Sequence, residues 1–315
     1  MNDRQNRISQ SERLTSAIAD PVDDVIYHYT SAEGLRGIIE NSEIWLSNVS
    51  FVNDTTECTA LQEETDLFND SEFTNSFVGD QWKSFIRSPD NIHNIYIASF
   101  SRGEESLEQY RAYGNYRIGF EANKLISRGY YLYQCVYNKE EIKKWIIEKE
   151  KLNEWDGEYL NDQYKRGAAS ILIFAASKKY KNKYFEKESE VRLISISNHS
   201  WGIYTNSFLM FEKEPPIHFR DHSAYKVPVP YVKFIIKNNE ENIKEAIENE
   251  TYKETKERKL RDEKTNKKDL LPITDISIGP MIHQKEAEIA CKILLSDKGY
   301  ENIKVNVSNI PYRGY

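Results

Sequence analysis

The sequence predicts an α+β fold with a mixed or antiparallel central sheet, and three observations carry this prediction. Short runs rich in β-branched and aromatic residues, typical of strands, recur along the chain. Helical segments with capping residues separate some of these runs, but the order is too irregular for the repeated βαβ units of a doubly wound sheet. Hydrophobic residues make up 39% of the 315 residues, which is enough for a core. We therefore expect one α+β domain over residues 22–315, after a polar leader at 1–21.

The first half of the domain supplies most of the expected strands. Thr30-Ser31-Ala32-Glu33 has the pattern of a capping box, with Thr30 as the N-cap, and Leu35, Ile38 and Ile39 give the helix that follows one apolar face. A second helix is expected over about 55–68, and one or two helical turns between Glu105 and Tyr113. The strands expected in this half are 25–29, 44–46, 95–100, 116–120 and 130–137.

The second half alternates strands with two charged helical insertions. One insertion covers about 139–184, and the other covers about 238–269, where 19 of 32 residues are charged. A segment of that composition is typical of a solvated helix or a mobile excursion. The remaining expected elements are strands at 190–196, 207–211, 232–236, 273–278 and 303–307, and a helix at 283–295.

Composition excludes several classes of protein. No run approaches the roughly 20 apolar residues of a membrane span, and the N-terminus lacks a signal-peptide core, so we expect a cytoplasmic protein with no membrane partner. The three cysteines are far apart and never form a CxxC pair, which argues against a disulfide framework or a zinc site. A net charge of −7 disfavours bulk electrostatic binding of nucleic acid but leaves a local basic patch open.

The segment His28-Tyr29-Thr30 is the first candidate for chemistry. It lies where a predicted strand meets a capped helix, and the free N–H groups at a helix N-terminus favour an anion such as a pyrophosphate. A histidine that only hydrogen-bonds across the sheet is the competing structural interpretation.

Glu188, Glu190 and Arg192 form the second candidate. If the strand already includes Glu188, all three project from one face, and the guanidinium holds one carboxylate ionised while the other remains available. A salt-bridged strand end is the alternative. In a third cluster, helix capping explains Asp54 and Glu57, so that only Asn53 keeps a claim on ligand binding.

Several segments together resemble the bacterial domain of unknown function 2971. They are YHYTSAEGLRGIIENSEIWLSNVSFVNDTTE, ASFS with YRIGFE, FEKESEVRLISI, and ISIGP with SNIPYR, and they run in pieces from about residue 25 to 313. The FND-like segment is one residue longer here, and a turn with Tyr110 and Tyr113 replaces an expected tryptophan.

The opening strand, histidine and capped helix are also similar to the start of ADP-ribosyltransferase domains. That resemblance implies an ADP-ribosyltransferase-like sheet and an enzyme that uses NAD as a substrate without a metal. It implies a macromolecular acceptor (RNA, DNA or protein), a role as a toxin or antiphage effector, and a neutralising partner. Under it, His28, Tyr29, Thr30, Asn53, Tyr113 and Arg192 bind NAD, and Glu190, His28 and Glu188 are catalytic. Glu190 carries the main role, Glu188 is the general base, and Tyr113 stacks on nicotinamide.

Two other functions remain open from the residues alone. The first is a metal-dependent phosphodiesterase or nuclease, in which Asp54, Glu57, Glu188 and Glu190 supply oxygen ligands for Mg²⁺. The second is a catalytically silent binding or sensor module of a defence system, in which His28 and Glu190 serve structure alone. The ADP-ribosyltransferase interpretation requires His28 and Glu190 to line one cleft, and side chains on opposite sides with no cavity joining them would contradict it.

Overall fold

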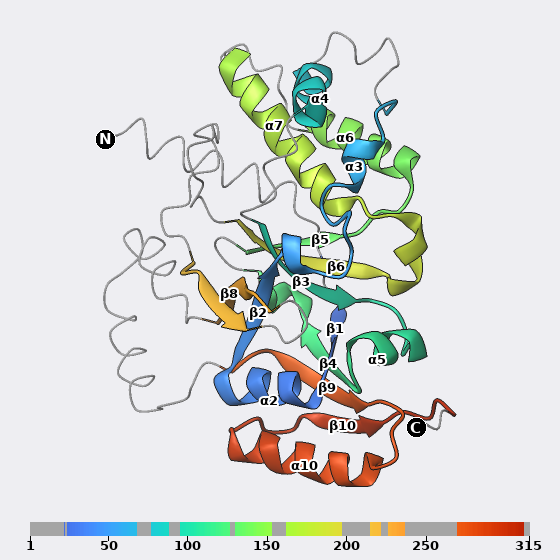
Figure 1. Ribbon diagram of the computed structural model, residues 1–315, viewed down its shortest axis with the longest axis vertical. Coiled ribbons are helices and arrows are strands. Elements are labelled where there is room, and N and C mark those ends of the chain that lie inside the picture. Colours follow the sequence, from blue (N-terminus) through green and yellow to red (C-terminus); the bar gives the residue numbers. More distant parts are fainter. Residues whose placement is uncertain are drawn as a thin grey trace, which may run out of the picture.

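The computed structural model describes residues 22, 24–67, 77–87, 95–126, 130–152, 162–196, 215–221, 226–236 and 270–311. Within these residues the chain is a mixed α/β fold around one open, mostly antiparallel sheet of ten strands (Figure 1). The strands are β1 (Val25–Thr30), β2 (Glu43–Asn48), β3 (Ile95–Ser101), β4 (Tyr116–Glu121), β5 (Tyr130–Gln134), β6 (Glu190–Ile196), β7 (His218–Asp221), β8 (Pro228–Ile235), β9 (Ile273–Ile278) and β10 (Lys304–Val307). The α-helices are α2 (Ala32–Asn41), α3 (Ala60–Glu63), α4 (Phe77–Arg87), α5 (Leu107–Tyr113), α6 (Lys139–Leu152), α7 (Asp162–Lys179) and α10 (Gln284–Asp297).

Strand β3 is the centre of the sheet because three strands pair with it. Strand β6 pairs along its whole length, from Ile95–Ile196 to Ser101–Glu190, and β5 extends the sheet beyond β6. The other edge of β3 is shared: β1 pairs at Ser101, whereas β2 pairs at Tyr96 and Ile97. The sheet therefore opens between β1 and β2 along residues 98–100 of β3.

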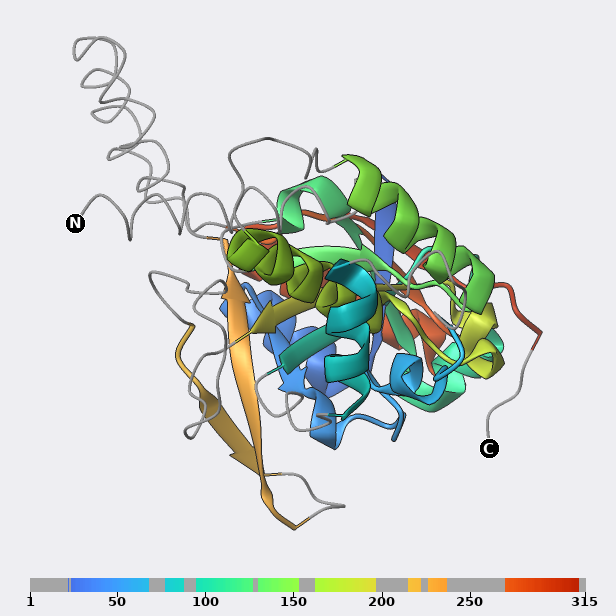
Figure 2. The ribbon, with the colours of Figure 1, turned by 90° about the horizontal axis from the view of Figure 1, so that it is seen from above.

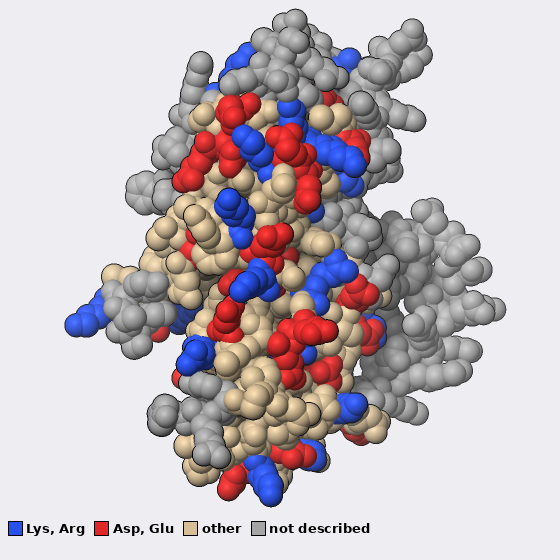
Figure 3. All heavy atoms as spheres, turned by 90° about the vertical axis from the view of Figure 1, so that its right-hand side faces the viewer, with Lys and Arg blue, Asp and Glu red and all other residues tan. Residues whose placement is uncertain are grey.

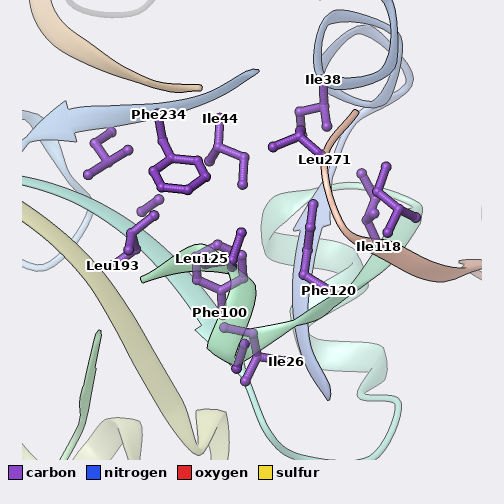
Figure 4. Close-up of a cluster of buried hydrophobic side chains, with 14 of the residues drawn as sticks. Ile26, Ile38, Ile44, Phe100, Ile118, Phe120, Leu125, Leu193, Phe234 and Leu271 are labelled. Atoms are coloured by element: carbon purple, nitrogen blue, oxygen red, sulfur yellow. The ribbon is translucent and has the colours of Figure 1, made fainter. Parts of the chain in front are cut away.

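Two apolar clusters cover the two faces of this sheet. Helices α3, α4, α6 and α7 pack on one face. Helix α7 contacts the other three, which buries the apolar side chains in its middle. On the other face, α2 and α10 cover a cluster that includes Ile26, Phe100, Val191 and Leu193 (Figure 4). Alternate residues of β3 and β6 thus face different clusters, as the two-residue period of a strand requires.

Helix α5 is fixed against the junction of β1 and α2. Ser106 caps its N-terminus by accepting from the backbone N–H of Gln109. The helix ends at Gly114, which has φ +124° and where an added Cβ would lie 2.5 Å from backbone atoms of Thr30 and Ser31. Only glycine allows both the conformation and the close approach, so this residue sets where Tyr113 lies.

Most expected elements are present, with specific differences. Ser31 rather than Thr30 is the N-cap of α2, since its hydroxyl accepts from the N–H of Gly34. The helix expected over 55–68 is reduced to α3 with flanking turns, and α4 and β7 were not expected. The leader at 1–21, the strand at 207–211 and the insertion at 238–269 lie outside the described residues, whereas α6 and α7 form the helical part of the insertion at 139–184. None of the described helices is both long and apolar enough to span a membrane.

Candidate functional site

The candidate site is built where β6 begins, next to the end of β3. Glu190 is the first residue of β6, and Glu190 and Arg192 share one face while Val191 and Leu193 face the apolar cluster of Figure 4. Glu188 was expected on the same strand, but it ends a short 3-10 helix, η4 (Lys183–Glu188). Ser189, between them, has φ +44°, so the chain turns before the strand starts. Glu188 therefore reaches the cluster from a turn.

Lys181 joins the carboxylates. Its Nζ lies 2.7 Å from an oxygen of Glu190, 2.9 Å from one of Glu188 and 3.9 Å from one of Glu57. The lysine side chain is 5% exposed, so these contacts form away from water. The segment after α7 thus supplies an ammonium that three carboxylates from separate parts of the chain surround.

Arg192 is the second cation, and it lies deeper than Lys181. Its side chain is fully buried, contacts Glu57, lies 3.2 Å from Glu190, and donates to the carbonyl oxygen of Lys178 at 2.6 Å. A buried ion pair contributes little net stability, but an unpaired buried charge is costly. Arg192 and its acidic partners therefore depend on one another.

The charges determine which groups are ionised. Burial acts to raise the pKa of Glu190, but the positive charges of Arg192 and Lys181 outweigh it and hold that pKa at about 2. For Glu57 burial is the larger effect, and its pKa is raised. The carboxylates of Glu190 and Glu57 raise the pKa of Lys181 despite its burial. At neutral pH, Glu190 is thus a buried anion beside two cations.

Glu188 and Tyr113 form the side of the cluster that meets solvent. The Glu188 side chain is 21% exposed, and Tyr113, at the end of α5, is 40% exposed and donates to Glu188 at 3.0 Å. Burial, reinforced by the Glu188 carboxylate, raises the pKa of Tyr113, so the phenol keeps its proton. Figure 3 shows acidic and basic side chains interspersed over this side of the molecule.

His28 does not contact the carboxylates. Along β1, Ile26 and His28 point toward the apolar cluster that contains Phe100, whose ring lies 5.6 Å from the imidazole, whereas Tyr27 and Tyr29 point to the opposite side. The imidazole Nδ1–H donates to the carbonyl oxygen of Ser99 at 2.9 Å, at the place where β1 and β3 separate. Burial lowers the pKa of His28.

Ser99 links the two halves of the expected site. Ser99 of β3 is the register partner of Arg192 on β6, and the two side chains lie on the same face of the sheet. The hydroxyl of Ser99 hydrogen-bonds Glu190 and helps to lower the pKa of that carboxylate. Ser99 is also exposed. His28 and Glu190 therefore lie on opposite faces of the sheet and do not line one cleft, so the expectation that they share a pocket was wrong, and Ser99 contacts both only through its carbonyl on one side and its hydroxyl on the other.

The other expected ligand residues lie in different surroundings. Tyr29 is buried, packs edge-on against Tyr110 of α5, and accepts from the N–H of Ser106 through its hydroxyl. Thr30 is buried beside Gly34 and Gly114. Asn53 is exposed, and it takes no part in the ion pairs described for the carboxylate cluster.

Three residues of the site were missed or misread from the sequence. Lys181 lies in a run of lysines that looks solvated, and Ser99 looks like an ordinary strand residue. Glu57 was explained by helix capping, but α3 begins only at Ala60 and has no side-chain cap; Asp54 accepts from Thr56 in the turn before it, and Glu57 is buried against Arg192. An acid in a short, poorly helical segment far from the other carboxylates gives no local signal of such a contact.

The carboxylates of the cluster are paired with side-chain cations of the protein itself. Lys181 occupies the position between the carboxylates that a divalent cation would need, and the described residues contain no group of three or more His, Cys, Asp or Glu able to hold a metal ion. Cys135, whose thiol donates to Glu190 at 3.5 Å, has its pKa raised by burial and remains protonated. No protein-family model, curated protein or solved structure matches this chain.

Proposed function

We propose that the chain is an NAD-dependent ADP-ribosyltransferase whose reaction centre is Glu188, backed by Lys181 and Glu190. The observation that carries the proposal is the pair of carboxylates held on one ammonium, one buried and one partly exposed. Buried charges with shifted pKa values are concentrated at functional sites, because a fold alone is served as well by apolar groups. The proposal rests on these carboxylates and not on His28, which donates to the carbonyl oxygen of Ser99 on β3 and faces away from Glu190.

The reaction requires a fixed negative charge near the ribose. The bond between the ribose C1′ and the nicotinamide nitrogen breaks, and its electron pair leaves with nicotinamide, which becomes neutral. Positive charge then develops on the sugar, and a preorganised carboxylate stabilises it more than it stabilises the ground state. An oxygen or nitrogen of the acceptor forms the new bond to C1′, and its proton passes to a carboxylate.

The exposed fractions of Glu188 and Glu190 assign the catalytic roles differently from the sequence prediction, in which Glu190 had the main role. Glu188 reaches solvent and is the carboxylate that would meet the ribose, whereas Glu190 is 2% exposed and holds Lys181 and Ser99 in place. Tyr113 is exposed beside Glu188 and is the ring placed to stack on nicotinamide. His28 acts through the carbonyl of Ser99 as a positioning residue.

The test is release of nicotinamide from NAD by the purified chain, with Glu188→Gln as the informative variant. Removing one preorganised charge typically lowers turnover by about 100- to 1,000-fold. Glu186→Gln is the matched control, because Glu186 belongs to the same 3-10 helix and lies outside the carboxylate cluster. If the wild type releases no nicotinamide with protein and nucleic-acid acceptors present, or if Glu188→Gln matches it, the proposal is wrong.

A cellular test addresses the role as a toxin or defence effector. Modification of a macromolecule in the host is expected to slow growth on expression of the wild type, while Glu188→Gln at the same protein level has no effect. Equal toxicity of the two proteins would separate any growth effect from ADP-ribosyl transfer.

A further inference from the structure

A second group of side chains outside the carboxylate cluster has its own organisation. On β2, β7 and β8, three rings lie in a row: Trp45 stacks on Tyr231 at 4.4 Å with an interplanar angle of 28°, and His218 of β7 lies 5.4 Å from Tyr231, tilted by 32°. The register of these strands puts the three rings on one face. Trp45 is 38% exposed, so the stack ends at solvent.

Two cations lie over the partly exposed ring of Trp45. The guanidinium carbon of Arg220 lies 5.8 Å from the ring centroid, and Nζ of Lys233 lies 5.9 Å from it. Both are held: Arg220 donates to the hydroxyl of Ser47 at 2.9 Å, and Lys233 lies 3.0 Å from the carboxylate of Glu43. Glu43 also accepts from the indole N–H of Trp45 at 2.7 Å, which fixes the ring.

The strands that carry these residues extend away from the rest of the fold. Figure 2 shows β7 and β8 projecting beyond the rest of the described structure. The opposite face of β2 and β8 is apolar and belongs to the cluster of Figure 4, with Ile44, Val232 and Phe234 buried. One face therefore anchors the projection, while the other presents a fixed aromatic ring with two cations close to it.

We infer that this face, defined by Trp45, Tyr231, His218, Arg220 and Lys233, binds single-stranded nucleic acid. Every base has a π-face that can stack on an exposed aromatic ring, and flanking cations match the phosphates on either side of the base. A duplex does not offer an unstacked base, so the preference is for single strands. The binding of single strands does not depend on the proposed function. The assignment of this surface as the binding site of the acceptor deepens the proposed function and rests on it.

The test is fluorescence anisotropy of the full-length chain with labelled oligo(U), oligo(dT) and duplex DNA, without NAD, using strands of about 12 nucleotides. We expect single strands to bind with a dissociation constant of roughly 10⁻⁶ to 10⁻⁴ M at physiological salt, and more tightly at lower salt. Trp45→Ala should weaken binding by about 5- to 150-fold, the range for loss of one base stack. Arg220→Gln with Lys233→Gln should reduce the slope of log K against log salt by about 1.4.

Matched controls separate the surface from general stickiness. Phe219→Ala removes an aromatic ring that is 65% exposed on the alternate face of β7, and Lys285→Gln with Lys292→Gln removes two positive charges from α10. These variants should bind like the wild type. Trp45→Phe, which keeps a ring, guards against misfolding and should retain most of the affinity.

Three results would overturn the inference. They are absence of single-strand binding, equal affinity for duplex with no effect of Trp45→Ala, or the same loss in the Phe219→Ala control. The chain could bind single strands as expected and release no nicotinamide. That result would support the binding surface and reject the proposed enzymatic function, so failure of one proposal is distinguishable from failure of the other.

Discussion

The two faces of strand β6 differ in what they contribute to the molecule. Val191 and Leu193 are fully buried among apolar side chains, whereas Glu190 and Arg192, one residue away in each case, are equally buried among charges. Burial of apolar area stabilises the fold directly, at about 25 cal/mol per Å². Desolvation of the charges largely cancels their attraction, so the charged face adds little stability for the same burial.

This difference is the reason for our proposal that the charged face serves a reaction. Its cations and carboxylates come from β6, η4, the segment after α7 and the region before α3, so four parts of the chain have to meet to satisfy them. A sheet packed with aliphatic residues at these positions would be simpler. The following predictions test whether the two faces behave as structure on one side and chemistry on the other.

The largest effect on stability is expected at Arg192. Arg192→Met leaves Glu57 and Glu190 buried without their main cation, which should lower the free energy of unfolding by about 3–5 kcal/mol. Leu193→Ala, on the apolar face, should lower the free energy of unfolding by a similar amount, about 2–5 kcal/mol, because it leaves a cavity. Urea unfolding at several pH values separates the two causes. The Arg192→Met penalty should shrink as pH falls and the carboxylates gain protons, while the Leu193→Ala penalty should stay constant; parallel behaviour would refute the distinction.

The acid limb of the stability curve should come from Glu190. Its pKa is about 2 in the folded chain against 4.5 in the unfolded one, so its contribution is present above pH 4.5 and is lost as pH falls toward 2. The shift corresponds to about 3 kcal/mol. Because the pKa of His28 is lowered in the folded chain, the unfolded chain gains that proton first, and stability also falls below pH 6.5. The raised pKa of Glu57 acts in the opposite direction, because the folded chain gains that proton first. Glu190→Gln should flatten the curve below pH 4.5, and an unchanged slope there would contradict the assignment.

The placement of Tyr113 should depend on one glycine. Gly114→Ala forces a side chain into a positive φ and against the backbone of Thr30 and Ser31, so we expect a loss of about 1–3 kcal/mol. Gly37→Ala is the control, because Gly37 lies inside α2 with no atom within 4 Å of an added Cβ, and it should stabilise the chain by about 0.5–1 kcal/mol. Thermal unfolding of both variants measures this, and a neutral Gly114→Ala would show that α5 is not fixed there.

The smallest expected effect is at the Tyr113 hydroxyl. Tyr113→Phe keeps the ring and removes one hydrogen bond to Glu188, which should cost about 0.5–1.5 kcal/mol or less because the residue is partly exposed. If the ring stacks on nicotinamide, Tyr113→Phe should keep a KM for NAD near that of the wild type, and Tyr113→Ala should raise it. Equal KM values for the two variants would remove stacking from the account.

Most of the sheet could be predicted from the sequence because its strands have local signals. Runs such as Ile95–Phe100 combine β-branched and aromatic residues, and the alternation at 190–193 correctly separated Val191 and Leu193 from Glu190 and Arg192. Strand β7 was missed because its four residues, HFRD, are too few to show a period and are stabilised by pairing with β8.

The site could be predicted only in part because its contacts are not local. Glu190 and Arg192 lie on one strand face, but Glu188 was misplaced because the left-handed conformation of Ser189 leaves no mark that distinguishes it from a strand residue. Lys181 and Glu57 acquire their importance from burial by distant elements. His28 was expected beside Glu190, but the alternation of side chains along β1 directs it to the apolar face. That direction is set by the register between β1 and β3, in which Tyr27 pairs with Ser101.

The most direct measurement compares Glu190→Gln with Val191→Ala, neighbours on opposite faces of β6, by nicotinamide release per folded molecule. Val191→Ala should lower the unfolding free energy by about 2 kcal/mol and keep the turnover of the wild type. Glu190→Gln, measured where it remains folded, should lose turnover, because Lys181 and with it Glu188 are no longer held in position. Retained turnover in folded Glu190→Gln would contradict the account, because the charged face would then be structural like its neighbour.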